Sequence, residues 1–142
     1  MGKVEELIRR ARAKITEPSH WTQKAMARDG EGRAVILGES SRYVQPTDPD
    51  AVAWCHNGAY VAIGAYVEKE RGLMPSSRLT KAGGMRIVEC YQAAWDRLYP
   101  EEPWRSTVGI VALNNSKPKR KAHAAILALM DAPTEYAAEQ GW

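Results

Sequence analysis

The chain has 142 residues, of which 44% are hydrophobic and 26% charged, and its formal net charge is +3. A chain of this length can bury a hydrophobic core without disulfides or metal ions, and its composition is that of a globular protein rather than a disordered one. The sequence pI of about 8.9 is mildly basic, so the overall charge does not by itself indicate a dedicated nucleic-acid-binding protein. We expect a single domain spanning residues 1–142.

The N-terminal segment and the apolar runs indicate a cytoplasmic protein without a membrane partner. The segment MGKVEELIRRARAKI lacks the apolar stretch of a signal peptide, and no apolar run approaches the ~18 residues that span a bilayer. Cys55 and Cys90 lie in apolar segments, where buried, reduced thiols are the common state. Their spacing is not typical of a zinc site, so we expect no metal and no cofactor.

The first part of the chain predicts an amphipathic helix followed by a hairpin. Apolar residues recur with the helical period over residues 3–15, and Pro18 ends this helix. The run Asp29-Gly30-Glu31-Gly32 is typical of a turn. We therefore expect Lys24–Arg28 and Arg33–Leu37 to form the two arms of a hairpin.

After a loop over residues 38–49, the middle of the chain predicts a central helix. Asp48 can cap a helix, and Pro49 suits its first position because the missing N–H leaves no hydrogen bond unmade there. The following segment is apolar on most sides up to about Glu70, and Gly72 stands where a helix commonly ends. The mid-helix Gly58 indicates a close crossing with another helix.

The last part of the chain predicts two helices and a short strand. A loop covers residues 72–84 and a helix covers about 85–98, with its inner face at Met85, Val88, Tyr91, Trp95 and Leu98. The β-branched run Thr107–Leu113 indicates a buried strand. Ser116 is expected to cap a helix that runs through Met130, with a fraying tail after Pro133. The expected fold is α+β, a single compact, mainly helical domain of about four helices with a small hairpin or sheet.

Three short blocks of sequence carry a family resemblance. The first is Trp21-Thr22-Gln23 with Ala27-Arg28-Asp29 and Gly32, the second is AVAWCHNGA over 51–59, and the third covers 110–132. In this order they resemble an uncharacterised family of small phage and bacterial proteins, a domain of unknown function. The third block departs from the family pattern, because Leu113-Asn114-Asn115 stands where the family has Trp-Asn-Asp, and the following helix start is basic. The resemblance implies a phage or mobile-element setting, which an anti-defence or host-takeover role would fit.

The basic run Lys117-Pro118-Lys119-Arg120-Lys121 is the sharpest local feature of the sequence. It opens the last predicted helix, where unpaired N–H groups already carry partial positive charge and cations are unfavourable. A bound anion would relieve this repulsion, and the flanking Asn114 and Asn115 would help to hold a phosphate. The basic residues of the first helix extend this surface only if that helix packs beside it. The alternative is a solvated charged face that contributes only solubility.

Arg28 and Cys55 are two weaker candidates. Arg28, with Asp29 and Gln23, lies at the expected hairpin, where a guanidinium and a carboxylate can bind a small polar ligand; the competing interpretation is a surface ion pair or an Asx turn. Cys55 is the candidate nucleophile of an alternative, enzymatic function. The adjacent His56 is a poor base for it, because neighbouring side chains on a helix point about 100° apart.

The leading prediction is a non-enzymatic protein that binds a macromolecule, either a protein or a nucleic acid, through the basic run. The sequence has no Walker-type loop, no G-x-S-x-G elbow and no H-E-x-x-H motif. One alternative is a small cysteine-dependent hydrolase or transferase that uses Cys55. Another is a virion accessory or structural protein, for which self-association into a homo-oligomer would be expected.

Overall fold

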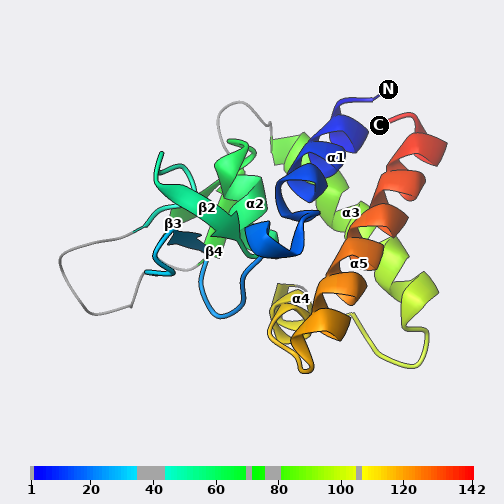
Figure 1. Cartoon of the computed structure of the whole chain (residues 1–142). Coiled ribbons are helices and arrows are strands. Elements are labelled where there is room, and N and C mark those ends of the chain that lie inside the picture. Colours follow the sequence, from blue (N-terminus) through cyan, green and yellow to red (C-terminus); the bar gives the residue numbers. More distant parts are fainter. Residues whose placement is uncertain (1, 35–43, 70–71, 76–80, 105–106) are drawn as a thin grey trace.

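Five α-helices and two small antiparallel sheets make up the described part of the chain, residues 2–34, 44–69, 72–75, 81–104 and 107–142 of a computed structural model (Figure 1). The elements in chain order are α1 (Lys3–Ile15), the 3-10 helix η1 (Pro18–His20), β1 (Ala27–Asp29), β2 (Ala51–Trp54), α2 (His56–Ala62), β3 (Tyr66–Lys69), β4 (Gly72–Pro75), α3 (Lys81–Leu98), α4 (Thr107–Asn114) and α5 (Lys119–Gln140). The predicted fold class, mainly helical α+β, is confirmed.

The helix α5 is the centre of the fold, in place of the central helix expected in the middle of the chain. It packs against α1, α3 and α4, and Figure 1 shows it crossing α3. The largest fully buried side chains come mostly from α1 and α5: Ile8, Ile15, Ile126, Leu129, Met130, Pro133 and Cys90. Each aliphatic side chain of this size contributes about 1.5–3 kcal/mol when buried, so the contact of α1 and α5 is a major part of the core.

The helix α1 has the bounds that its apolar period predicts. Its inward residues are buried: Val4, Leu7, Ile8, Ala11 and Ile15. The helix runs antiparallel to α5, because the N–H of Glu5 donates to the Trp142 carbonyl at 3.1 Å while the Ile15 carbonyl bonds to Nε2 of His123 at 2.7 Å. The C-terminal end of α1 therefore lies beside the beginning of α5.

The helix α5 begins later and ends later than the sequence predicts. Ser116 does not cap it, because its hydroxyl donates to the Leu113 carbonyl at 2.7 Å and Pro118 occupies the cap position. The expected fraying after Pro133 is wrong, since the helix continues to Gln140 and ends at Gly141 in the left-handed conformation. Pro133 removes one helical hydrogen bond, but its ring is fully buried in the core, and this packing favours a continuous helix.

The helix expected from Pro49 to Glu70 is wrong, because this segment forms β2, α2 and β3. Asp48 makes an Asx turn rather than a helix cap, with its Oδ1 accepting from the N–H of Asp50 at 2.9 Å. In β2, Ala51 and Ala53 are buried while Val52 is 44% exposed, which is the alternation of a half-buried strand. Gly72, expected just after a helix, lies in β4.

The close approach predicted at Gly58 is present, but its partner is not a helix. A Cβ atom on Gly58 would lie 1.9 Å from the carbonyl oxygen of Met26, in the bend before β1. The same carbonyl accepts the N–H of Cys55 at 3.2 Å. Glycine is required here because any side chain would push the Met26 backbone away from α2.

The predicted hairpin is only partly correct. The chain does turn at residues 29–32, where Gly32 N–H donates to the Asp29 carbonyl at 2.9 Å, and Arg28 forms an antiparallel bridge with Ala34. However, the main partner of β1 is β2, with Ala27 opposite Trp54. The rest of the expected second arm, residues 35–37, lies outside the described residues, as does the part of the expected loop at 38–43.

The strand expected at Thr107–Leu113 is wrong, because these residues form α4. This helix packs on α5, and its Gly109 lies under Trp95, whose ring would be 3.1 Å from an added Cβ. The helix α3 begins at Lys81 rather than 85, and the loop expected over residues 72–84 also contains β4. Met85, Val88 and Leu98, expected inside, are 55%, 43% and 41% exposed, while Ile87, Cys90, Tyr91, Ala94 and Trp95 are buried.

None of the helices in the described part of the chain is both long enough and apolar enough to cross a membrane.

Candidate functional site

The side chains of the basic run lie exposed at the beginning of α5. Lys117, Lys119, Arg120 and Lys121 are all exposed, and among the described residues none of them forms an ion pair. The first turn of α5 contains no acidic residue and its cap, Pro118, makes no side-chain hydrogen bond. The partial positive charge at the N-terminus of this 22-residue helix therefore adds to the charge of the four cations, and both are exposed to the same region of solvent.

The basic residues of α1 add little to this surface, although α1 packs beside α5. Nε of Arg9 donates to Oε1 of Glu5 at 2.9 Å, and Nη2 of Arg12 donates to Oδ2 of Asp131 at 3.2 Å. Lys14, near the end of α1, places its ammonium 4.6 Å from the ring centroid of Trp54. The cations of α1 are thus largely matched to partners within the protein.

Asn114 is buried and fully engaged inside the protein rather than presented to a ligand. Its Oδ1 accepts from Nε1 of Trp21 at 3.0 Å and from the N–H of His56 at 3.2 Å. Its Nδ2 donates to the Thr22 carbonyl and to Oδ1 of Asn115, both at 3.2 Å. The side chain is 3% exposed, so its role is to join three parts of the chain.

Asn115 and Gln23 continue the same junction toward the basic run. Oδ1 of Asn115 accepts the N–H of Lys24 at 2.8 Å. Nε2 of Gln23 donates to the carbonyls of Asn114 at 2.9 Å and of Ser116 at 2.8 Å. Residues from all three blocks that carry the family resemblance therefore meet at Asn114.

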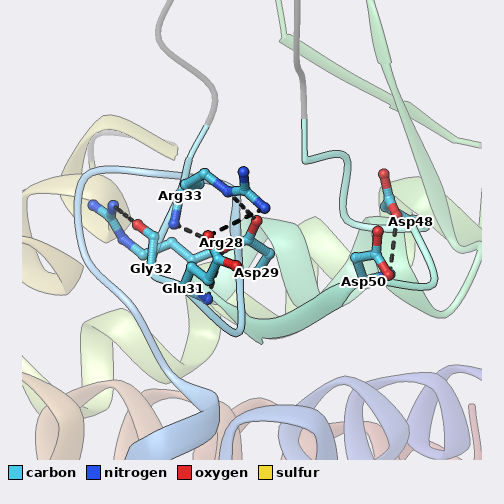
Figure 2. Close-up of polar contacts among 7 residues, drawn as sticks. All are labelled: Arg28, Asp29, Glu31, Gly32, Arg33, Asp48 and Asp50. Carbon is cyan, nitrogen blue, oxygen red and sulfur yellow. Dashed lines mark hydrogen bonds and ion pairs between the residues drawn. The ribbon is translucent and has the colours of Figure 1, made fainter.

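The Arg28 side chain makes hydrogen bonds to nearby residues of the chain and does not pair with Asp29. Its three donor nitrogens reach Oγ1 of Thr22 at 2.7 Å, the Gly32 carbonyl at 3.0 Å and the Gln23 carbonyl at 3.1 Å. Figure 2 shows the guanidinium directed at Gly32 and away from the Asp29 carboxylate. Arg28 therefore ties the turn to the segment before it.

Asp29 forms an Asx turn and an ion pair with Arg33 (Figure 2). Oδ1 accepts the N–H groups of Glu31 at 3.0 Å and Arg33 at 2.9 Å, and Oδ2 accepts Nε of Arg33 at 2.8 Å. Burial acts to raise the pKa of Asp29, but the hydrogen bonds from Arg33 and Glu31 and the charge of Arg33 lower it overall. The carboxylate stays ionised and holds the turn, so it is not free to act as an acid or a base.

Cys55 lies at the N-cap of α2, not inside a helix as the sequence suggests. Its Sγ accepts the N–H of Gly58 at 3.3 Å and lies 3.8 Å from Sδ of Met26. The side chain is half-buried. Cys55 is therefore the more accessible of the two cysteines. Cys90 is fully buried, and burial raises the pKa of its thiol to about 11.

A buried polar chain that the sequence did not reveal begins at the next residue, His56. Its Nδ1 bonds to Oδ1 of Asn57 at 2.9 Å, its Nε2 to the Tyr91 hydroxyl at 2.7 Å, and Tyr91 to the Tyr60 hydroxyl at 2.6 Å. Burial lowers the pKa of His56 to about 4 and raises the pKa values of both tyrosines. Both ring nitrogens of His56 are thus occupied, and the ring does not serve Cys55 as a base.

Within the described residues, no group of three or more His, Cys, Asp or Glu side chains is arranged to hold a metal ion. Comparison of the chain with models of protein families, with curated proteins and with solved structures finds no match. The family resemblance and the phage setting that it implies therefore stay expectations.

Proposed function

We propose that the protein is a non-enzymatic binding protein that holds nucleic acid by its phosphate backbone through the basic run. The observation that carries this proposal is the exposed group Lys117, Lys119, Arg120 and Lys121, which has no ion-pair partner among the described residues. Elsewhere in the protein, Arg9, Arg12, Arg33 and Arg97 each face a carboxylate. Unmatched cations gathered in one place are the electrostatic pattern of a phosphate-binding surface.

The position of these cations also argues for a binding role. Each of them opposes the helix dipole of α5, at a typical cost of about 0.3–1 kcal/mol at low ionic strength. A sequence optimised for stability alone would place acidic residues in this turn, and α5 has none there. A bound phosphate backbone would turn this unfavourable electrostatic interaction into a favourable one, because it brings negative charge to the positive end of the helix.

Fluorescence anisotropy with labelled single- and double-stranded DNA and RNA tests the proposal. If the four side chains each contact one phosphate of duplex DNA, the affinity should fall roughly 150-fold between about 50 and 200 mM salt, since the slope is about −0.9 per contact. Changing all four residues to Gln should abolish most of this binding and flatten the salt dependence. The melting temperature of this variant should be unchanged or higher, because the cations oppose the helix dipole.

A matched variant controls for net charge. Changing Arg9, Arg10, Arg86 and Arg97 to Gln also removes four exposed cations, but none of them belongs to the basic run. This control should keep wild-type affinity for the oligonucleotides. Equal loss of binding in both variants would reduce the interaction to non-specific attraction, and no binding of the wild type at low salt would contradict a nucleic-acid partner and favour an acidic protein surface.

A second candidate function, a cysteine-dependent hydrolase or transferase, is favoured by one observation, the Gly58 N–H directed at Sγ of Cys55. Iodoacetamide labelling near neutral pH separates it from the binding proposal. We expect Cys55 to be alkylated in the native protein and Cys90 only after unfolding, because Cys90 is fully buried. Mass spectrometry of the labelled peptides measures both sites.

The rate of labelling decides the functional question. Modest reactivity at Cys55 would agree with a capping thiol. A native rate more than about tenfold above that of the unfolded chain would indicate an activated nucleophile and favour the enzyme. Labelling of Cys90 in the native protein would contradict the structure of the core around α3.

A further inference from the structure

Lys24 has a backbone conformation that an L-amino acid rarely adopts. Its φ is 61°, and it is the one non-glycine residue with positive φ in the described part of the chain. This left-handed region brings Cβ close to the backbone and is usually left to glycine or asparagine. A lysine is kept in such a conformation only where its surroundings determine it.

The surroundings of Lys24 are the loop that leads into the basic run. The Lys24 N–H donates to Oδ1 of Asn115 at 2.8 Å. The residue before it, Gln23, donates from Nε2 to the carbonyls of Asn114 and Ser116. Three hydrogen bonds thus fasten residues 23–24 to residues 114–116, immediately before Lys117.

This fastening adds a cation from a second segment to the surface of the basic run. The Lys24 side chain is exposed and forms no ion pair among the described residues. The ammonium of Lys119 also lies near this junction, 6.0 Å from the ring centroid of Trp21. Cations from two segments far apart in the sequence therefore flank one hydrogen-bonded junction.

We propose that Lys24 is a phosphate-contacting residue and that the protein binds a phosphodiester backbone between Lys24 and the basic run. The left-handed conformation, held by Gln23 and Asn115, fixes the backbone of Lys24 against Asn115, two residues before Lys117 in the chain. This inference rests on the proposed function, because it assigns a further residue to the same surface. It excludes a surface in which the N-terminal part of α5 acts alone.

The substitution Lys24→Gly separates binding from folding, because it removes the charge and the backbone strain together. Its melting temperature should equal or exceed that of the wild type. Its affinity for labelled duplex DNA should fall, and the slope of log K against log salt should become less steep by about 0.9, the loss of one phosphate contact. Lys24→Arg keeps the charge and should retain the wild-type slope.

Arg86→Gln is the matched control. It removes one exposed cation whose guanidinium carbon lies 5.1 Å from the ring centroid of Trp142, just after the far end of α5. At a rise of about 1.5 Å per residue, 22 residues place this site roughly 33 Å from the basic run, which is beyond the Debye length of about 10 Å at 0.1 M salt. Its salt slope should be that of the wild type.

The outcomes distinguish this inference from the proposed function. If Lys24→Gly binds with the wild-type slope while the four-residue Gln variant has lost binding, the inference is wrong and the proposed function stands. If Lys24→Gly and Lys24→Arg lose affinity equally, charge is not the cause and the inference is also wrong. If the wild type binds no oligonucleotide at low salt, both are wrong.

Discussion

Replacing Asn114 by Ala should lower the free energy of unfolding by about 2–6 kcal/mol, since it leaves two buried donors unpaired and each costs about 1–3 kcal/mol. The two donors are Nε1 of Trp21 and the N–H of His56, which both bond to Oδ1 of Asn114. Trp21 is 3% and His56 is 4% exposed, so bulk water does not replace the lost acceptor. Urea unfolding measures the effect as a lower transition midpoint with an unchanged m value.

Asn115→Ala is the natural control for this experiment. Asn115 is the next residue and of the same type, but it is only half-buried and accepts the N–H of the exposed Lys24. Because water can reach this N–H, we expect a loss of about 1 kcal/mol, the contribution of an ordinary hydrogen bond. Equal losses in the two variants would contradict the assignment of Asn114 as the residue that joins the three segments.

The dependence on Asn114 shows why sequence reasoning misassigned it. The sequence places Asn114 and Asn115 beside a basic run, and amides beside cations favour a phosphate site. Their actual partners, Trp21 and Lys24, precede them by 93 and 91 residues. No local pattern reports a hydrogen bond over that separation, so the interpretation as ligand-binding residues was the one available from the sequence.

The elements that were predicted correctly are those whose local pattern agrees with their packing. The helix α1 is an example, because the stripe of apolar side chains that predicts it is also the face that contacts α5. In α5, too, the apolar residues that predict the helix face the core, since Ile126, Leu129 and Met130 are all fully buried. Local periodicity and tertiary contact give the same answer in these two helices.

The elements that were predicted wrongly are short and apolar on more than one side. An apolar run has no period to separate a short strand from a short helix, so the segment from Ala51 to Ala62 suggested one long helix. It is divided because Ala51–Trp54 pairs with Ala27–Asp29 and Cys55 caps the helix that follows. In α4, packing on α5 and under Trp95 overrides the strand preference of its β-branched residues.

Lys24 is the part of the candidate site that gave no signal in the sequence. A position in the left-handed region is usually occupied by glycine or asparagine, and here it is a lysine between a glutamine and an alanine. Its conformation follows from bonds to Asn115 and from the anchoring of Gln23, which only the folded chain brings together. The basic run, by contrast, could be found because its residues are consecutive.

The buried chain from His56 gives the second large prediction, which concerns pH. The side-chain amide oxygen Oδ1 of Asn57 can only accept, so Nδ1 of His56 carries the proton and Nε2 accepts from the Tyr91 hydroxyl. Tyr91 in turn accepts from Tyr60. A proton added to Nε2 would place a charge at a site that is shielded from water, which is why burial lowers the pKa of His56 to about 4.

His56 should therefore account for a loss of about 3 kcal/mol of stability as the pH falls from about 6.5 to about 4, at 1.36 kcal/mol per pKa unit. In this window the unfolded chain binds a proton at His56 and the folded chain does not, so the free energy of unfolding rises with pH. Tyr60 and Tyr91 contact the ring, and Tyr66 and Cys90 lie close enough to these tyrosines to act on their charge. Burial raises the pKa values of all four groups, so they stay neutral throughout this window.

Urea unfolding of the wild type and of His56→Gln, at several pH values across this window, isolates the contribution of His56. Gln can accept the Tyr91 hydroxyl but does not titrate, so the variant should lack the extra acid sensitivity even if it is less stable at neutral pH. Every other histidine and carboxylate is common to both proteins, and its effect cancels in the difference between the two slopes. Parallel pH profiles would mean that the imidazole of His56 is already solvated in the native state, and the chain Asn57–His56–Tyr91–Tyr60 would then not be a closed, dry part of the core.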